Sequence, residues 1–227
     1  MGDWSDYAKD YEEKVFSLTS VPQRRRQIVE RIQSGKVLNM GCGSVPYLNQ
    51  DLIAAGNRVV ASDLCPEMLR ESMIQYTHPD LSHMLADSRD IPERDCTFDT
   101  VVSVNSILPP QRSDADHMFS EAYRVLKPEG ILVAFLVAYS NPKRLDDILG
   151  LGLKFDEEQK RMWDTGEWQC YHDPDTISRN MTESGFLSYT LEKVWLKTKN
   201  ETGQLSRIYG YDAAKTLSFE WLLSAVK

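Results

Sequence analysis

Cysteines are few in this sequence, and they are not spaced for joint use. The chain has 227 residues, and its four cysteines are scattered without a Cys-x-x-Cys pair: Cys42, Cys65, Cys96 and Cys170. That spacing indicates neither a disulfide framework nor a structural zinc site. His78, His83 and His117 show no ligand spacing either. We therefore expect no metal centre.

Long apolar runs are also missing. None reaches the roughly 18 residues that a membrane-spanning helix requires. The polar segment 1–10 lacks the apolar core of a signal peptide. The default expectation is a cytoplasmic protein that does not enter a membrane.

Positive charge is scarce as well. The formal net charge is -8, and the one short basic run is Arg24-Arg25-Arg26, inside a helical pattern. A general nucleic-acid binder needs a broad basic surface to neutralise phosphates. We interpret this run as a solvated helix face, and nucleic acid is not an expected partner.

The overall composition is typical of a globular protein, with 41% hydrophobic and 26% charged residues. Its length suits one domain, which we take as 1–227. Apolar segments typical of buried strands occur at 36–40, 58–62, 82–86, 98–104 and 131–138. Helical patterns start at Pro22 and cover 47–55, 66–76, 114–126 and 174–185. This alternation predicts an α/β fold with a doubly wound, mostly parallel sheet.

Two further strands are expected near the end of the chain. They cover 187–198 and 217–226, and no obvious crossover helix lies between them. We expect them to pair as a hairpin, since a late antiparallel strand on a parallel sheet is permitted.

A glycine turn follows the first expected strand. Gly41 can take a positive φ angle there, and Gly43 lets a ligand touch the backbone. Asp63 lies 22 residues after Gly41, at the end of the second strand. An acidic residue at about that interval usually holds ribose hydroxyls. The alternative for Asp63 is a helix cap before Pro66.

Asp87 and Ser88 follow the third expected strand. A carboxylate or hydroxyl there can accept a hydrogen bond from an adenine amino group. The alternative is an ordinary loop aspartate.

Several stretches together resemble class I S-adenosylmethionine (SAM)-dependent methyltransferases. They are residues 37–44, Asp63 to Leu69, Asp87, Phe98-Asp99 and residues 121–130. The resemblance implies a seven-stranded sheet with an antiparallel last strand, SAM as cofactor and S-adenosylhomocysteine as product. It also implies a cofactor site formed by Tyr11, Asn39, Gly41, Gly43, Asp63, Leu64, Met68, Asp87, Ser88, Ser103 and Asn105. Related small-molecule enzymes carry an N-terminal lid, which here would be 1–20.

The glycine turn departs from the family in two ways. Such families usually carry an acidic residue where Asn39 stands, and the third glycine of the usual turn is replaced by Val45. A dinucleotide-binding turn needs glycine or alanine at the sixth position, where this chain has Pro46. A nicotinamide dehydrogenase is therefore disfavoured.

The segment 139–172 interrupts the α/β alternation and is expected to form the acceptor side. It brings Trp163 and Trp168 together with Tyr171 and His172, which we interpret as candidate catalytic residues. His172 is the candidate general base, because its reference pKa is about 6.5. The alternatives are aromatic residues that only cap the sheet and a structural histidine beside a helix N-terminus.

The predicted activity is methyl transfer to a small-molecule acceptor through an O, N or C nucleophile. Two alternatives remain open. One is a SAM-binding protein without turnover, which the departures from the family pattern at Asn39 and Val45 support. The other is an RNA methyltransferase that uses Arg24 to Arg26 and the lysines at 193–199.

Overall fold

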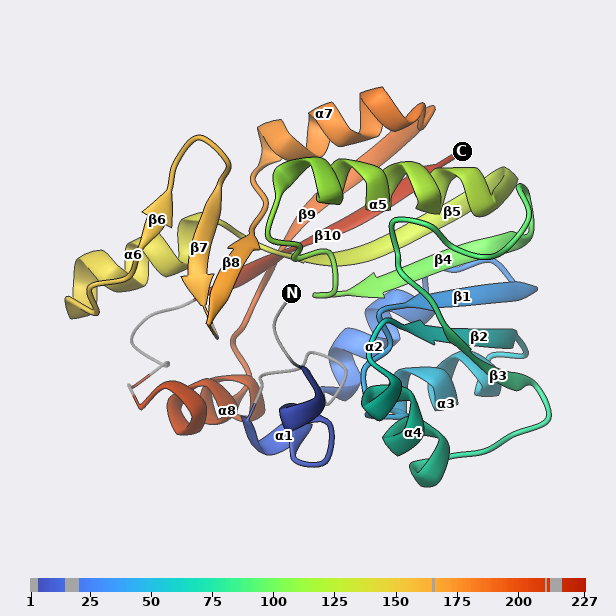
Figure 1. The fold of residues 1–227 in the computed structure, drawn as a ribbon, viewed down its shortest axis with the longest axis horizontal. Helices are drawn as coiled ribbons and strands as arrows, with labels where there is room; N and C mark the ends of the chain where they lie inside the picture. The colour runs from blue at the N-terminus through green and yellow to red at the C-terminus, as the bar shows by residue number, and fades with distance from the viewer. Residues whose placement is uncertain (1–3, 15–20, 165, 211, 213–217) are drawn as a thin grey trace.

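One mixed sheet of seven strands runs through the molecule, with helices on both faces (Figure 1). The computed structural model describes residues 4–14, 21–164, 166–210, 212 and 218–227. The sheet order is β3-β2-β1-β4-β5-β10-β9. The strands are β1 (Lys36–Met40), β2 (Arg58–Asp63), β3 (Leu81–Leu85), β4 (Phe98–Val104), β5 (Leu126–Val137), β9 (Ser188–Trp195) and β10 (Phe219–Val226). The predicted fold class is confirmed, including the antiparallel strand: β10 pairs antiparallel with both β5 and β9.

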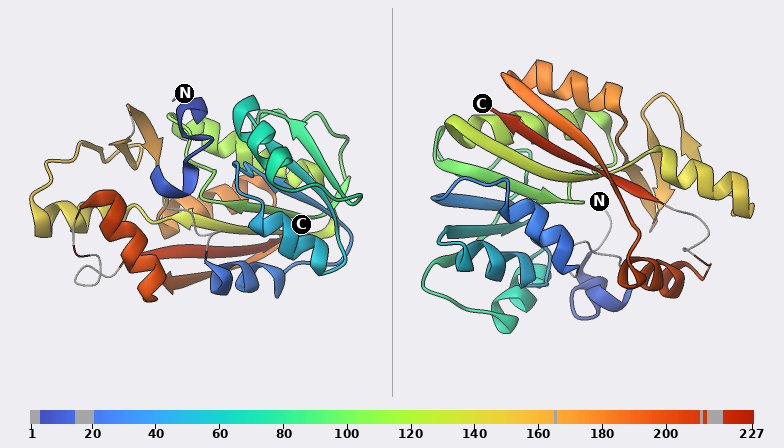
Figure 2. Two further views of the ribbon diagram at one scale, coloured as in Figure 1. Left: turned by 90° about the horizontal axis from the view of Figure 1, so that it is seen from below. Right: turned by 180° about the vertical axis from the view of Figure 1, so that it is seen from behind.

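Helices connect these strands and cover the sheet. They are α1 (Tyr11–Lys14), α2 (Pro22–Val29), α3 (Tyr47–Ala54), α4 (Pro66–Gln75), α5 (Arg112–Val125), α6 (Ser140–Leu149), α7 (Pro174–Ser184) and α8 (Lys199–Tyr209), with a 3₁₀ turn at Trp4–Tyr7. Helices α5 and α7 lie together on one face, and α2 and α3 lie on the other (Figures 1 and 2). None of the helices within the described ranges combines the length and apolar character that a bilayer crossing demands.

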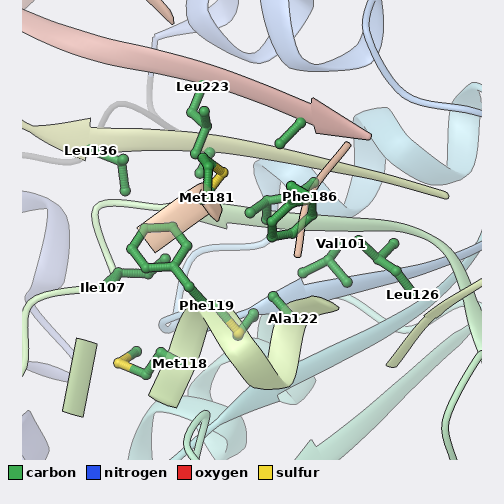
Figure 3. Packing of buried hydrophobic residues seen from close by; sticks show 14 of the residues in the cluster. Val101, Ile107, Met118, Phe119, Ala122, Leu126, Leu136, Met181, Phe186 and Leu223 are labelled. Carbon is green, nitrogen blue, oxygen red and sulfur yellow. The ribbon is translucent and has the colours of Figure 1, made fainter. Parts of the chain in front are cut away.

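The sheet has a hydrophobic core on each face. On the α5 side, Phe119 packs with Ile107, Met181 and Leu136, all at most 1% exposed (Figure 3). The opposite core joins residues of α2, α3, α8 and the strands, including Ile28, Leu48, Leu205 and Leu222. Strands β1, β4 and β5 face apolar cores on both sides, which explains their nearly continuous apolar sequences.

The C-terminal part differs from the prediction in one element. Strands β9 and β10 do pair as a hairpin, but α8 lies between them. Its sequence is polar, and Leu205 is its main contribution to the core. A capping box starts it: the Thr198 side chain accepts from the Glu201 N–H, and the Glu201 carboxylate accepts from the Thr198 N–H. The capping-box spacing of Thr198 and Glu201, with Gly210 at the end of the helix, was the available sequence signal.

The segment after β5 forms a small subdomain that projects from one end of the molecule (Figure 1). Helix α6 is followed by a three-stranded sheet of β6 (Phe155–Asp156), β7 (Arg161–Asp164) and β8 (Glu167–Cys170). Arg112, at the start of α5, holds this subdomain in place by donating to the carbonyls of Gln159, Lys160 and Tyr171. Asp173 caps the following helix α7, as its carboxylate accepts from the Thr176 N–H.

Candidate active site

The glycine turn after β1 leaves room for a ligand on one side only. Gly41 has φ 69° and Gly43 has φ 63°, so both lie in the left-handed region that favours glycine. A Cβ on Gly41 would come within 2.3 Å of the Ser106 Cβ, because Ser106 packs directly against the turn. The Ser106 hydroxyl lies 2.7 Å from both the Met40 carbonyl oxygen and the Ser103 hydroxyl. A Cβ on Gly43 would instead face the Tyr11 ring, 3.9 Å away.

Asp63 at the end of β2 lies beside this turn. Its carboxylate accepts from the Gly43 N–H at 2.9 Å and from the Cys65 N–H at 3.0 Å. Burial raises the pKa of this carboxyl group, and the backbone N–H groups partly offset the rise. Helix α4 has no side-chain cap, so the alternative of a helix cap is not what Asp63 provides. Each carboxylate oxygen has a second lone pair, so Asp63 can bind these two N–H groups and also accept from ribose hydroxyls.

A cleft of about 530 Å³ opens above these residues, at the carboxyl ends of β1, β2 and β4. That volume is in the usual range of small-molecule sites, about 300–1,000 Å³. Nine of the predicted cofactor residues line it: Tyr11, Gly41, Gly43, Asp63, Leu64, Met68, Asp87, Ser88 and Asn105. A ligand in this position agrees with the rule that open α/β sheets bind ligands beyond the carboxyl ends of their strands.

Asn39 and Ser103, also predicted, do not line the cleft. Asn39 is 3% exposed and donates from its amide to the Asn49 side chain at 2.8 Å. Ser103 is fully buried and pairs with Ser106. Their geometry supports the wall of the site rather than contact with a ligand.

Asp87 is held by a cation that the sequence analysis did not single out. Arg89 donates to both Asp87 oxygens, at 2.6 Å and 3.0 Å, and forms a second ion pair with Asp114 at 3.2 Å. The hydrogen bonds from Arg89 lower the pKa of Asp87, which is therefore ionised at neutral pH. Arg89 also lines the cleft. Its position two residues after Asp87 was the available sequence signal.

Tyr11 closes the cleft from the N-terminal side. Burial, together with the charge of Asp63, raises the pKa of its phenol to about 12, so Tyr11 keeps its proton at neutral pH. Trp4 also lines the cleft. The predicted lid 1–20 is only partly visible here, because 1–3 and 15–20 lie outside the described residues. The lid itself stays a prediction.

The side of the cleft at which the acceptor was predicted is formed by the loop after β4 and by the projecting subdomain. Leu108, Pro109, Pro110 and Met118 provide an apolar wall, and Glu167 is the subdomain residue on the cleft. Trp168, next to Glu167, stacks edge to face on Trp163, with ring centroids 5.7 Å apart. Trp163 is 43% exposed. Both tryptophans were predicted for the acceptor side, but neither lines the cleft, whereas Glu167 between them does.

His172 requires a correction. It is fully buried behind the loop after β4, where its Nε2 lies 2.8 Å from the Ile107 carbonyl oxygen and its ring contacts Phe119 edge to face. Burial, with the nearby charge of Arg112, lowers its pKa to about 3. A general base must reach the proton that it removes, and His172 does not line the cleft. The structure therefore supports the structural alternative.

Tyr171 does not reach the cleft either. Its side chain is 5% exposed, and its hydroxyl donates to Asp164 at 3.3 Å. It packs with Tyr139 and Met162 inside the subdomain. The geometry thus gives Tyr171 a packing role and offers no direct contact with substrate.

The predicted residue Asn105, just after β4, contacts a glutamate of β10 that was not predicted. Asn105 has φ 51°, an unusual left-handed conformation for a non-glycine residue. Its side-chain amide donates to Glu220 at 3.3 Å. Glu220 is 5% exposed, and its charge within the apolar run of β10 was the signal in the sequence.

These residues fit an adenosine-containing methyl donor. The turn at Gly43 leaves backbone accessible, Asp63 and Asp87 offer carboxylate oxygens for hydroxyl and amino groups, and Asn105 presents a buried amide oxygen without a hydrogen-bond partner among the described residues. An unpartnered buried acceptor is costly and is commonly explained by a missing ligand or water.

Comparisons with known proteins agree with this geometry. Residues 38–134 match the family model described as a methyltransferase domain. Malonyl-[acyl-carrier protein] O-methyltransferase of Erwinia billingiae is 36% identical over 100 residues, which are 44% of this chain and 38% of that protein. The chain spans between 38% and 53% of the length of the curated relatives that it matches.

Solved structures share the fold at low sequence identity. A SAM-dependent methyltransferase from Methanosarcina mazei has a TM-score of 0.62 at 17% identity, covering 88% of this chain and 96% of that one. Phosphoethanolamine N-methyltransferase 2 of Haemonchus contortus, in complex with SAM, has a TM-score of 0.63 at 17% identity, covering 91% of this chain and 52% of that one. Residues 38–134 thus match a methyltransferase domain, and the chain has the fold of SAM-dependent methyltransferases of known structure.

Proposed function

We propose that this protein transfers a methyl group from SAM to a small-molecule acceptor, with S-adenosylhomocysteine as the product. The observation that carries the proposal is the cleft at the carboxyl edge of the sheet. It brings Gly41, Gly43, Asp63 and Asp87 together from three separate strand ends. This is the constellation that the family resemblance predicts for the donor.

The sulfonium of SAM supplies an already activated methyl group. The protein's own contribution is therefore alignment, which is worth about 7–11 kcal/mol when the reacting atoms are held in line. Asp63 binds the ribose hydroxyls, Asp87 accepts from the adenine amino group, and Tyr11 excludes water above Gly43. No triad of acid, base and nucleophile is needed for such a displacement.

The acceptor binds between Tyr11 and the apolar wall of Leu108, Pro109 and Met118 in this proposal. The low polarity of that wall and the negative net charge suit a small molecule better than a nucleic acid. The relatives are named for acceptors that differ in the methylated atom, oxygen in one and nitrogen in the other. The attacked atom is therefore left open in the proposal.

The RNA alternative loses its main support in the structure. Arg24 is buried, pairs with Glu201 and donates to the Trp195 carbonyl, so our interpretation of this run as a solvated face was wrong at Arg24. Arg25 pairs with Asp51 at 2.5 Å. Both arginines therefore form ion pairs within the protein. Filter binding to RNA at graded salt tests the alternative, because phosphate contacts give a steep salt slope.

Binding of the donor is tested by calorimetry and by thermal unfolding. SAM and S-adenosylhomocysteine should both raise the melting temperature, as a ligand that binds only the native state must. NADH should change nothing, because Pro46 replaces the last glycine of a dinucleotide turn. Absence of SAM binding at millimolar donor would refute the proposal.

Turnover is tested separately with labelled SAM and a panel of acceptors. Transfer of label to a small molecule supports the enzyme. SAM binding without label transfer to any small molecule or RNA favours the alternative of a SAM-binding protein without turnover.

A further inference from the structure

A buried glutamate lies behind the cleft and has no role in the function proposed so far. Glu220 is the second residue of β10 and pairs with Val137 at the carboxyl end of β5. Because β10 runs antiparallel to β5, its first residues reach the edge of the sheet where the cleft opens. Its side chain contacts Asn105, which lines the cleft.

Two acceptor atoms at this point lack hydrogen-bond partners among the described residues. They are Oδ1 of Asn105 and Oε2 of Glu220, both shielded from solvent. The Asn105 amide donates to the other Glu220 oxygen, which turns its own carbonyl oxygen away from Glu220. Buried acceptors without donors are costly, and more so when they are charged. The pair is therefore suited to a ligand that brings hydrogen-bond donors.

The charged groups around Glu220 do not compensate its negative charge. Among the described residues, Arg24 of α2 and Glu201 of α8 are the charged groups that act on it, and they already pair with each other. An ionised Glu220 therefore leaves this buried cluster with a net charge of -1. Burial raises the pKa of Glu220 to about 8, with Glu201 adding to the rise while Asn105 and Arg24 oppose it. A cationic ligand group would restore the balance.

SAM has such a group in its methionine part, the α-ammonium. The family usually places an acidic residue at position 39, but this chain has Asn39, whose amide is committed to Asn49 and which does not line the cleft. The first strand therefore offers no carboxylate to the ammonium. Glu220 supplies one from the opposite side of the glycine turn, through Asn105.

We propose that the α-ammonium of the donor binds at the Asn105 carbonyl oxygen, with Glu220 as the positioning residue that orients this amide and provides the compensating negative charge. The inference rests on the proposed function, because it assigns one end of the same donor. No covalent step is involved.

Paired ligands and a matched variant test the assignment. The probes are S-adenosylhomocysteine and its deamino analogue, in which hydrogen replaces the ammonium group. Wild-type protein should bind the analogue more weakly than S-adenosylhomocysteine. Glu220→Gln, which keeps the shape and the hydrogen bond to Asn105, should lower the affinity for S-adenosylhomocysteine by about tenfold or more, as expected for a charged partner. The affinity for the deamino analogue should change by no more than about twofold.

Equal weakening of both ligands in Glu220→Gln would mean a merely structural role and would overturn the assignment. Unchanged affinity for S-adenosylhomocysteine would overturn it too, while leaving the proposed function standing. If the wild-type protein binds neither S-adenosylhomocysteine nor SAM, the proposed function fails and this inference falls with it.

A second measurement on the wild-type protein does not depend on how the variant folds. The bound ammonium stabilises the ionised carboxyl, so it lowers the pKa of Glu220 and releases protons. A tenfold gain in affinity at pH 7 corresponds to a fall of this pKa from about 8 to about 6, so the protonated fraction at pH 7 falls from roughly 0.9 to 0.1. Calorimetry in two buffers of different ionisation enthalpy should then detect about 0.8 protons released per S-adenosylhomocysteine bound. The deamino analogue should release none, and equal release by both ligands would contradict the proposal.

Discussion

The contact between Gly41 and Ser106 leads to a sharp prediction for Gly41→Ala. An alanine at φ 69° pays about 1–2 kcal/mol of backbone strain. Its Cβ would also lie 2.3 Å from the Ser106 Cβ, so one of the two strand ends must move. Overpacking of that kind costs about 1–3 kcal/mol. The reduced entropy of the unfolded chain returns about 0.4–1 kcal/mol. The net loss in free energy of unfolding is therefore about 1–5 kcal/mol, centred near 3.

The matched control is Gly56→Ala. Gly56 has φ 86°, and nothing lies within 4 Å of a Cβ built there. The loss in free energy of unfolding in Gly56→Ala should be limited to the strain and entropy contributions, or about 0–1.6 kcal/mol. Urea unfolding of both variants measures the difference, provided that the slope with denaturant is unchanged.

Gly41→Ala should also disturb the ligand site. The displaced Ser106 loses hydrogen bonds to Met40 and Ser103 at the rim of the cleft. We expect SAM affinity to fall in Gly41→Ala and to stay constant in Gly56→Ala. The reasoning would be refuted if both variants unfolded at the same urea concentration, or if Ser106→Gly failed to restore part of the stability of Gly41→Ala.

Three further outcomes are expected. Asp63→Ala should weaken SAM binding by about 1.5–3 kcal/mol in calorimetry, as for a hydrogen bond to a charged group, while a folded circular-dichroism spectrum is retained. Phe119→Ala, in the fully buried core under α5, should lower the free energy of unfolding by about 3–5 kcal/mol, and a loss below 1 kcal/mol would contradict the packing. His172 resists protonation in the folded state, with a pKa near 3 against about 6.5 unfolded, so stability should fall as pH drops from 6.5 towards 3. His172→Gln should flatten that part of the profile in urea titrations at several pH values, and an unchanged profile would show that another group is responsible.

The α/β fold was predictable because each buried strand corresponds to a short apolar segment in the local sequence. Residues 131–137 are apolar without interruption and lie between two covered faces. The glycine turn and Asp63 were predictable for a similar reason, since backbone conformation and strand ends leave short, fixed spacings. Helix α8 also carries local signals, although it was not predicted: Thr198 and Glu201 have the spacing of a capping box, and Gly210 ends the helix.

The roles of His172 and Glu220 could not be predicted, because the burial of both side chains is decided by distant segments. His172 is a neutral core residue only because Phe119 and the Ile107 carbonyl pack against it. Glu220 acquires its partner Asn105 from a residue 115 positions earlier. Local sequence gives the residue type at such sites, while the sheet order decides whether it faces ligand, water or core.

The order of strands has a consequence for biosynthesis. β9 is made before β10, yet its place in the sheet depends on β10, which separates it from β5. A nascent chain that has completed β9 therefore holds a strand with no ladder to join. During that interval the edge of β5 is also unpaired, and exposed strand edges promote association between chains. Arrival of β10 closes both edges in one step, so ribosome-bound intermediates that stop short of β10 should engage chaperones far more than those that include it.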